Sequence, residues 1–288
     1  MTDKAISNEV EKWDISITSS RGYLDLNLKE LWRYRDLLMM FVKKDIITVY
    51  KQTILGPIWF LIQPIFTSLI YVIVFSRFAN ISTDAVPPIL FYLGSNTLWN
   101  YFSDTLNITS KTFTENATVF GKVYFPRLIL PLSKVVSGLI KLLIQFALFM
   151  AFWLYYLLVK HAISPTWYIA LFPALLLIMA LLSLGLGIII TSMTTKYRDL
   201  TFLIAFGVQL WMYATPVIYP ISMVSRDKQF WLWLNPLTSL FETFKLAFLG
   251  KGTFSPFWLM YSVVFTIVSL LFGMLVFNKV EKRFIDTV

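Results

Sequence analysis

The chain has 288 residues, of which 57% are hydrophobic and 14% are charged, and its mean hydropathy is +0.69. Soluble domains carry about 25% charged and about 45–50% apolar residues, so this composition excludes a water-soluble globular protein. The net charge is +9, cysteine is absent and His161 is the one histidine, which excludes disulfide frameworks, thiolate metal sites and sites built from several histidines.

Residues 1–51 form a polar N-terminal segment without the pattern of a cleaved signal peptide. Within it, 28–51 has an amphipathic helical pattern with Arg33, Lys43 and Lys44 on the polar face. Arg35 and Asp45 depart from the pattern because they fall toward the apolar side. We expect an interface helix on the inner leaflet, its basic face toward anionic lipid. A docking role for a soluble partner is the alternative, and spacing alone leaves both open.

Seven stretches without Asp, Glu, Lys or Arg follow, at 52–76, 85–103, 142–159, 161–195, 200–225, 229–241 and 252–278. A membrane span needs about 20 apolar residues. Six stretches meet or approach this length, and together they predict a six-span transmembrane domain over 52–279. Because Pro165 interrupts the fourth stretch, its helix is expected to begin near Trp167.

The stretch 229–241 is too short to cross the membrane and is broken by Asn235 and Pro236. We expect re-entrant helices there, within an external loop over 223–255. With both termini inside, the segments outside the spans carry 18 Lys and Arg on the inner side and 6 on the outer side. The positive-inside rule therefore places both termini in the cytoplasm. The basic charge is explained by this topology, so nucleic-acid binding is not expected.

The cytoplasmic loop 104–134 contains Gly121, Pro126 and Pro131, which limit helix to short pieces, one of them around 112–120. A loop of this kind is either plain connection or a partner contact, and the sequence leaves both open.

The residue pattern gives little support for a catalytic function. The candidate carboxylates Asp104, Glu115, Asp199 and Glu242 lie on different loops, and no phosphate-binding loop motif occurs. Catalysis is therefore not expected. The spans lack the ionisable groups of a secondary transporter, and snorkelling near a helix end explains Lys141. Energy for transport would have to come from a partner.

Aromatic and small residues in the spans carry two further expectations. Tyr92, Trp99, Trp211 and Tyr213 crowd the second and fifth spans, where rings could stack on sugars in a channel or simply form an interfacial belt and core packing. Trp231 lies in the re-entrant segment. Ser183, Gly185 and Gly187 in the fourth span are expected to permit close helix packing.

Five motifs in order resemble the permease subunits of polysaccharide-export ABC transporters, including O-antigen and teichoic-acid exporters. They are ELWRYRDLLMMFVKKDIITVYKQTILGPIWFLIQP (Glu30 to Pro64), KVYFPRLILPLSK (Lys122 to Lys134), KYRDL (Lys196 to Leu200), ATPVIYP (Ala214 to Pro220) and LNPL (Leu234 to Leu237). The resemblance extends from about residue 25 to the tail.

The resemblance implies an all-α integral membrane protein of the bacterial inner membrane that forms a homodimer and binds two copies of a nucleotide-binding subunit. ATP and Mg²⁺ would be bound by that partner, with no cofactor on this chain, and the cargo would be a lipid-linked polysaccharide. It also implies an interface helix with Arg35 and Asp45 beside the polysaccharide entry. A coupling helix carrying Glu115, Asn116, Phe120 and Lys122 would contact the ATPase. Trp231, Asn235 and Pro236 would lie at the exit.

Three alternatives remain open. The cargo could be teichoic acid or capsule, it could be a smaller lipid or a drug, or the chain could be a membrane scaffold without transport. The channel would be lined by Tyr92, Trp99, Trp211 and Tyr213 if a polymer is the cargo.

Overall fold

The computed structural model describes residues 28–51, 56–116, 125–194, 197 and 199–285, and every regular element in these ranges is helical. The α-helices are α1 (Leu28–Arg33), α2 (Arg35–Lys51), α3 (Trp59–Tyr71), α4 (Pro88–Ser110), α5 (Thr112–Glu115), α7 (Ile129–Leu158), α8 (Phe172–Thr194), α9 (Leu200–Tyr213), α10 (Arg226–Trp233), α11 (Pro236–Leu249) and α12 (Pro256–Ile285). Short 3₁₀ helices are η1 (Gly56–Ile58), η3 (Trp167–Leu171) and η4 (Ile221–Met223), and a π-helix, η2 (Val72–Phe78), continues α3.

Four helical segments in the described ranges are long and apolar enough to cross a membrane: Trp59–Phe78, Ile129–Leu158, Trp167–Thr194 and Pro256–Lys279. The third begins at Trp167, as its sequence predicts. Helix α4 does not qualify although it has 23 residues, because its buried face carries polar side chains such as Asn96 and Thr105. Helix α9 is apolar but has only 14 residues. The predicted all-helical membrane architecture is thus confirmed in its general form.

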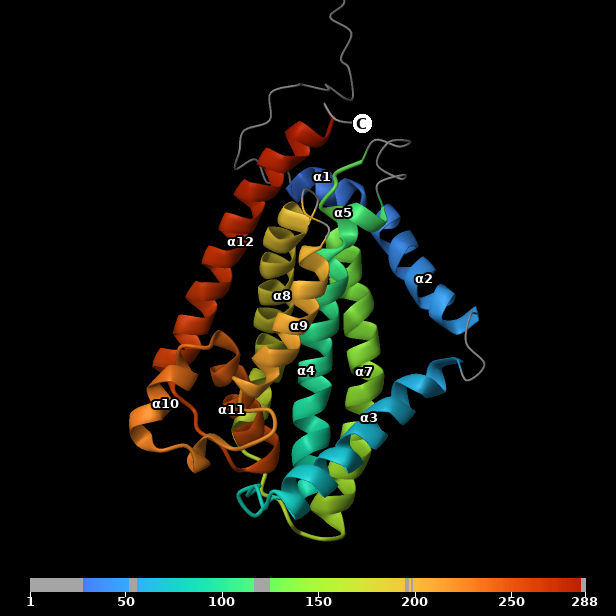
Figure 1. Ribbon diagram of the computed structural model, residues 1–288. Coiled ribbons are helices and arrows are strands. Elements are labelled where there is room, and N and C mark those ends of the chain that lie inside the picture. The colour runs from blue at the N-terminus through green and yellow to red at the C-terminus, as the bar shows by residue number, and fades with distance from the viewer. Residues whose placement is uncertain (1–27, 52–55, 117–124, 195–196, 198, 286–288) are drawn as a thin grey trace, which may run out of the picture.

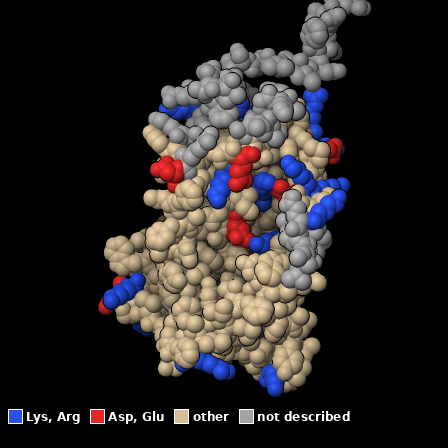
Figure 2. Space-filling model, turned by 45° about the vertical axis from the view of Figure 1, so that its right-hand side comes forward, with Lys and Arg blue, Asp and Glu red and all other residues tan. Residues whose placement is uncertain are grey.

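The bundle is built around α4 (Figure 1). Helix α4 packs against α7, α8 and α9, and α12 packs along α8. Helices α1 and α5 and the C-terminal end of α12 lie at one end, whereas α10 and α11 lie toward the other (Figure 1). Charged side chains gather near the first end, and most of the surface below them is uncharged (Figure 2). An uncharged band beside a charged end is the pattern of a chain embedded in lipid.

Aromatic rings fill the core between α7, α8 and α11. The ring of Phe146 stacks on Phe172 with 4.5 Å between centroids, and Phe149 lies 5.6 Å from Phe244. Phe248 contacts all four rings. Such ring pairs add about 0.5–1.5 kcal/mol each beyond the apolar area that they bury, so α11 is held firmly against the bundle.

Two glycines of α8 allow neighbouring helices to approach closely. A Cβ at Gly185 would lie 2.9 Å from the backbone nitrogen of Leu270 in α12, and a Cβ at Gly187 would lie 2.6 Å from Thr109 Cγ2 in α4. The small residues thus face two different helices. The close packing predicted from Gly185 and Gly187 is confirmed.

The segment 104–134 differs from its sequence-based expectation. Helix α4 continues to Ser110, so Asp104 lies inside a helix, and α7 begins at Ile129. Pro131 is accommodated in the first turn of α7, where a missing backbone N–H costs no hydrogen bond. Lys141 is therefore well inside α7 rather than near a helix end, and the snorkelling explanation for it was wrong.

The predicted break at Asn235 and Pro236 is confirmed. Helix α10 ends at Trp233 and α11 begins at Pro236. The Asn235 side-chain oxygen accepts a hydrogen bond from the backbone N–H of Leu237 at 3.1 Å, which caps α11. Helix α11 then runs to Leu249, so Glu242, expected in a loop, lies in the middle of a buried helix.

Candidate functional site

Helix α2, the segment predicted to be an interface helix, is attached to the bundle through an ion pair. The Lys134 ammonium of α7 donates to both oxygens of Asp45 in α2, at 2.7 and 2.8 Å, and the Ser137 hydroxyl donates to the same carboxylate at 3.2 Å. Phe41 and Val42, one turn earlier, are buried. Asp45 departs from the amphipathic pattern because it faces α7, so its side chain contributes to docking α2 on the bundle.

The basic residues of this segment remain at the surface. Arg33, Arg35, Lys43 and Lys44 are all exposed. The Arg35 guanidinium lies 5.7 Å from the centre of the Trp32 ring and 3.9 Å from the carboxylate of Asp36. Arg35 thus makes local contacts within its own helical segment, unlike Asp45.

A second ion pair joins α4 and α7, farther along α7 than the first. The Lys141 ammonium donates to a carboxylate oxygen of Asp104 and lies 5.6 Å from the centre of the Phe60 ring. These residues and the Asp45–Lys134 pair line one cavity of about 430 Å³ between α2, α3, α4 and α7. Figure 2 shows a hollow on this face with acidic and basic side chains around it.

Replacing Asp45 by Ala is expected to loosen α2 from α7. A hydrogen bond to a charged group contributes about 1.5–3 kcal/mol, so the population with α2 detached should rise at least about tenfold. Hydrogen exchange of the α2 amides measures this local opening. The charge swap D45K with K134D should restore much of the protection, whereas equal protection in wild type and D45A would show that the pair does not hold α2.

The short helix α5 lies at the same end of the bundle as α1 (Figure 1). Its Phe113 ring stacks on Phe277 of α12, with 4.8 Å between centroids. At its end Glu115 is exposed, and Asn116 donates to the carbonyl of Thr112 at 2.9 Å. Phe120 and Lys122 lie outside the described residues. The part of the segment that is described presents Glu115 at the surface on a short helix anchored by Phe113.

The four aromatic residues predicted to line a channel fall into two groups. Tyr92 and Trp99 are buried in the core of the chain, so in this conformation their rings do not face a channel. Trp211 packs edge-on against Phe102, with 5.4 Å between centroids. Tyr213 is 53% exposed on α9. Of the four rings, Tyr213 is the most exposed, Trp211 is partly exposed, and Tyr92 and Trp99 would need a rearrangement to face a channel between chains.

At the other end of the bundle, Trp231 is 72% exposed on α10, while Pro236 is buried. The Asn235 amide donates to Thr215 Oγ1 at 2.8 Å and to the carbonyl of Ala214 at 3.2 Å. The two motifs ATPVIYP and LNPL, separated along the chain, are therefore joined by hydrogen bonds in space.

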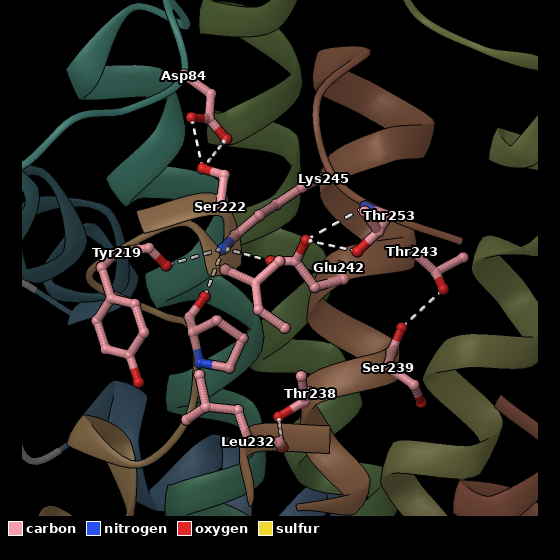
Figure 3. A network of polar contacts seen from close by, with 12 residues as sticks. Asp84, Tyr219, Ser222, Leu232, Thr238, Ser239, Glu242, Thr243, Lys245 and Thr253 are labelled. Carbon is pink, nitrogen blue, oxygen red and sulfur yellow. Dashed lines mark hydrogen bonds and ion pairs between the residues drawn. The ribbon is translucent and has the colours of Figure 1, made fainter. Parts of the chain in front are cut away.

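A buried lysine joins α11, the helix that follows LNPL, to the ATPVIYP motif (Figure 3). The ammonium of Lys245, a residue 1% exposed, donates to the carbonyls of Pro216 at 2.5 Å and Tyr219 at 3.3 Å. It also donates to Glu242 at 3.2 Å and lies 4.7 Å from the centre of the Phe91 ring. Burial lowers the pKa of Lys245, and the negative charge of Glu242 opposes that shift.

The carboxylate of Glu242 accepts hydrogen bonds from Thr253 as well as from Lys245. It accepts from the backbone N–H and the hydroxyl of Thr253, at 3.2 and 3.3 Å. Sequence reasoning singled out Glu242 alone and missed Lys245. The signal was the i,i+3 spacing of the two charges in an otherwise apolar helix directly after LNPL, because oppositely charged side chains at that spacing can pair.

Comparison with known proteins identifies the family of this chain. The family model described as ABC-2 type transporter matches residues 36–249, which include nearly all of α2, the ATPVIYP and LNPL motifs and α11. The chain belongs to the ABC-2 type transporter family.

Similar proteins within this family carry a specific name. The chain is 29% identical over 224 residues to the O-antigen export system permease protein RfbA of Myxococcus xanthus, covering 77% of this chain and 83% of that protein. It is 24% identical over 251 residues to the protein of the same name from Klebsiella pneumoniae, covering 87% and 94%. The resemblance to polysaccharide-export permeases is therefore confirmed. Permeases of the ABC-2 family work with an ABC ATPase subunit.

Proposed function

We propose that this chain is the permease subunit of an ATP-driven ABC exporter that moves a lipid-linked, O-antigen-like polysaccharide from the cytoplasmic to the outer side of the membrane. The observation that carries the proposal is the match to O-antigen export permeases over most of both chains. The general architecture of an all-helical bundle with apolar helices agrees with it.

The proposed topology has six spans, in which α4 and α9 join the four apolar helices, and α10 and α11 form the external re-entrant segment. Both termini lie in the cytoplasm of a bacterial inner-membrane protein. The gathering of charge at the end that holds α1 and α5 supports this orientation (Figures 1 and 2). Helix α4 can span because its polar side chains face other helices rather than lipid.

The proposed ATPase contact is the segment that begins with α5. Glu115 is exposed there, and Asn116, Phe120 and Lys122 complete the proposed coupling surface. ATP and Mg²⁺ would be bound by two copies of the partner, with no cofactor on this chain. ATP-driven closure of the partner would press on α5, which transmits the movement through Phe113 to α8 and α12.

The proposed channel lies between two copies of the chain. Helix α9 exposes Phe202, Phe206 and Tyr213, whose spacing of four and seven residues places the three rings on one face of the helix. Rings can stack on the apolar faces of sugars and leave the hydroxyl groups hydrated. A sliding polymer needs weak and repeated contacts of this kind. Trp231 would meet the polymer near the exit, beside Asn235 and Pro236.

Replacing Tyr213 by Ala is expected to slow export about two- to tenfold, since a ring contact contributes about 0.5–1.5 kcal/mol. Assembly with the ATPase should be unchanged. Tyr155 of α7, exposed to a similar degree, provides the control variant Y155A, which should export normally. Surface polysaccharide measured over time gives the rate. If the Y213A variant no longer assembled with the ATPase subunit, the Tyr213 ring would be needed for packing rather than for contact with the polymer.

Deleting the gene tests the proposed function as a whole. Lipid-linked polysaccharide should accumulate inside the cell and disappear from the surface, and the wild-type gene should reverse both changes. An unchanged surface polysaccharide would contradict the proposal and would direct attention to export of a smaller lipid or drug. A loss of teichoic acid or capsule alone would contradict the O-antigen-like assignment.

A further inference from the structure

The cavity between α2, α3, α4 and α7 has two chemically distinct parts. One part is apolar and is lined by Ile46, Phe60, Ile108, Ile140 and Ile144. The other carries the two ion pairs, Lys134 with Asp45 and Lys141 with Asp104, together with Lys44. An apolar wall beside charged groups matches a ligand that is itself amphiphilic.

The charges of the cavity do not cancel. Asp45 and Asp104 each neutralise one lysine. Lys44 lines the same cavity and is exposed, and it forms no ion pair with any residue in the described ranges. One positive charge, that of Lys44, is therefore left over at the cavity. The complementary ligand carries negative charge.

A buried hydroxyl supplies a second, independent indication of a ligand. Thr105 lines the cavity and is 1% exposed, yet its hydroxyl has no hydrogen-bond partner among the described residues. Gly138 lies opposite, and a Cβ there would come within 2.8 Å of the Thr105 Oγ1. Buried polar groups are almost always hydrogen-bonded, so this hydroxyl is suited to donate to an oxygen atom of a bound molecule.

The volume and position of the cavity select the class of ligand. About 430 Å³ accommodates a lipid headgroup with the first part of its chains, whereas several linked sugars would not fit. The cavity lies beside the basic interface helix, and basic pockets between membrane helices on the cytoplasmic side bind anionic headgroups. The ligand would come from the surrounding membrane rather than from the transported polymer.

We propose that this cavity binds one anionic phospholipid of the inner leaflet. Lys44 binds its phosphate, Thr105 donates to a glycerol or ester oxygen, and an acyl chain lies along the isoleucine wall. Because α2 and α7 both line the cavity, the bound lipid strengthens the attachment of α2 to α7, to which the Asp45–Lys134 ion pair also contributes. This inference rests on the proposed orientation in the membrane but not on the proposed substrate, since it holds whichever substrate is exported.

Native mass spectrometry of the full chain, purified in micelles that contain phosphatidylglycerol and phosphatidylcholine, tests the proposal. One phosphatidylglycerol should be retained per chain in preference to phosphatidylcholine. The K44A variant should retain phosphatidylglycerol about fivefold less, because one lysine near an anionic headgroup contributes about 1 kcal/mol of attraction. The matched variant K43A removes the neighbouring exposed charge, which does not line the cavity, and should retain the lipid as the wild type does.

A second variant separates binding from folding. Replacing Thr105 by Val keeps the shape and removes a hydroxyl without a described partner, so the chain should fold as stably as the wild type but retain phosphatidylglycerol less. Equal retention of the two phospholipids, or equal losses in K44A and K43A, would overturn the proposal. Displacement of phosphatidylglycerol by excess inorganic phosphate would overturn it too, because the site would then select a free anion.

Discussion

Replacing Lys245 by Met is expected to lower the free energy of unfolding by about 3–5 kcal/mol, the usual cost of breaking a buried ion pair from one side. The methionine keeps most of the apolar stem. It leaves the carboxylate of Glu242, which is 1% exposed, without its cation. It also leaves the carbonyls of Pro216 and Tyr219 without the ammonium donor. Equilibrium unfolding of the full chain in detergent measures the loss.

The double variant K245M with E242Q is the decisive control. Glutamine keeps an oxygen for the Thr253 N–H and hydroxyl and removes the unpaired charge, so the double variant should recover a large part of the lost stability. K228M, which removes an exposed lysine of α10, should unfold as the wild type does. A loss below about 1 kcal/mol in K245M would contradict the account, because it would match an exposed ion pair.

The second large effect is expected at the contact between α8 and α12. Gly185→Ala would place a Cβ 2.9 Å from the backbone nitrogen of Leu270 and 3.1 Å from the carbonyl carbon of Ser269. Backbone atoms cannot turn aside as the end of a flexible side chain can, so the two helices must separate. Overpacking of this kind costs about 1–3 kcal/mol, which the same unfolding measurement would detect.

Gly207 of α9 provides a matched control, since a Cβ there meets nothing within 4 Å. Gly207→Ala should be neutral or stabilising by up to about 1 kcal/mol, because alanine is the better helix former. If the two variants changed stability alike, helix propensity rather than the close approach of α8 and α12 would explain the result.

Sequence reasoning succeeded where a local pattern had a local cause. The missing charges identified the apolar helices, and Asn235 with Pro236 identified the end of one helix and the start of the next. Gly185 and Gly187 indicated close packing before any neighbour was known. In each case the residue type itself carries the signal, whichever neighbour it meets in the fold.

Predictions from the sequence failed where the position of a residue depends on a partner that is distant along the chain. Charged residues were taken as ends of spans, because an unpaired charge in a membrane helix is costly. Asp104 and Lys141 avoid that cost by pairing across 37 positions, so both lie within helices. Asp45 was recognised as a departure from its pattern, but its partner Lys134, 89 positions away, could be found only from the packing of α2 on α7.

The aromatic residues show a further limit. Tyr92 and Tyr213 looked equivalent because each lies in a ring-rich span. Helix α4 is surrounded by α7, α8 and α9 and buries Tyr92, whereas α9 leaves Tyr213 exposed. The polar residues of α4 are themselves buried, so polarity does not indicate which face of a membrane helix packs inward, and only the arrangement of helices distinguishes the two rings.

Polysaccharide transport in sealed vesicles tests the central claim most directly. The full chain would be reconstituted with its ATPase subunit, and lipid-linked polysaccharide would be supplied on the side that holds the ATPase. The account predicts that polymer appears on the opposite side only when ATP is hydrolysed. ATP hydrolysis without any movement of polymer, while a small lipid or a drug crosses instead, would contradict it.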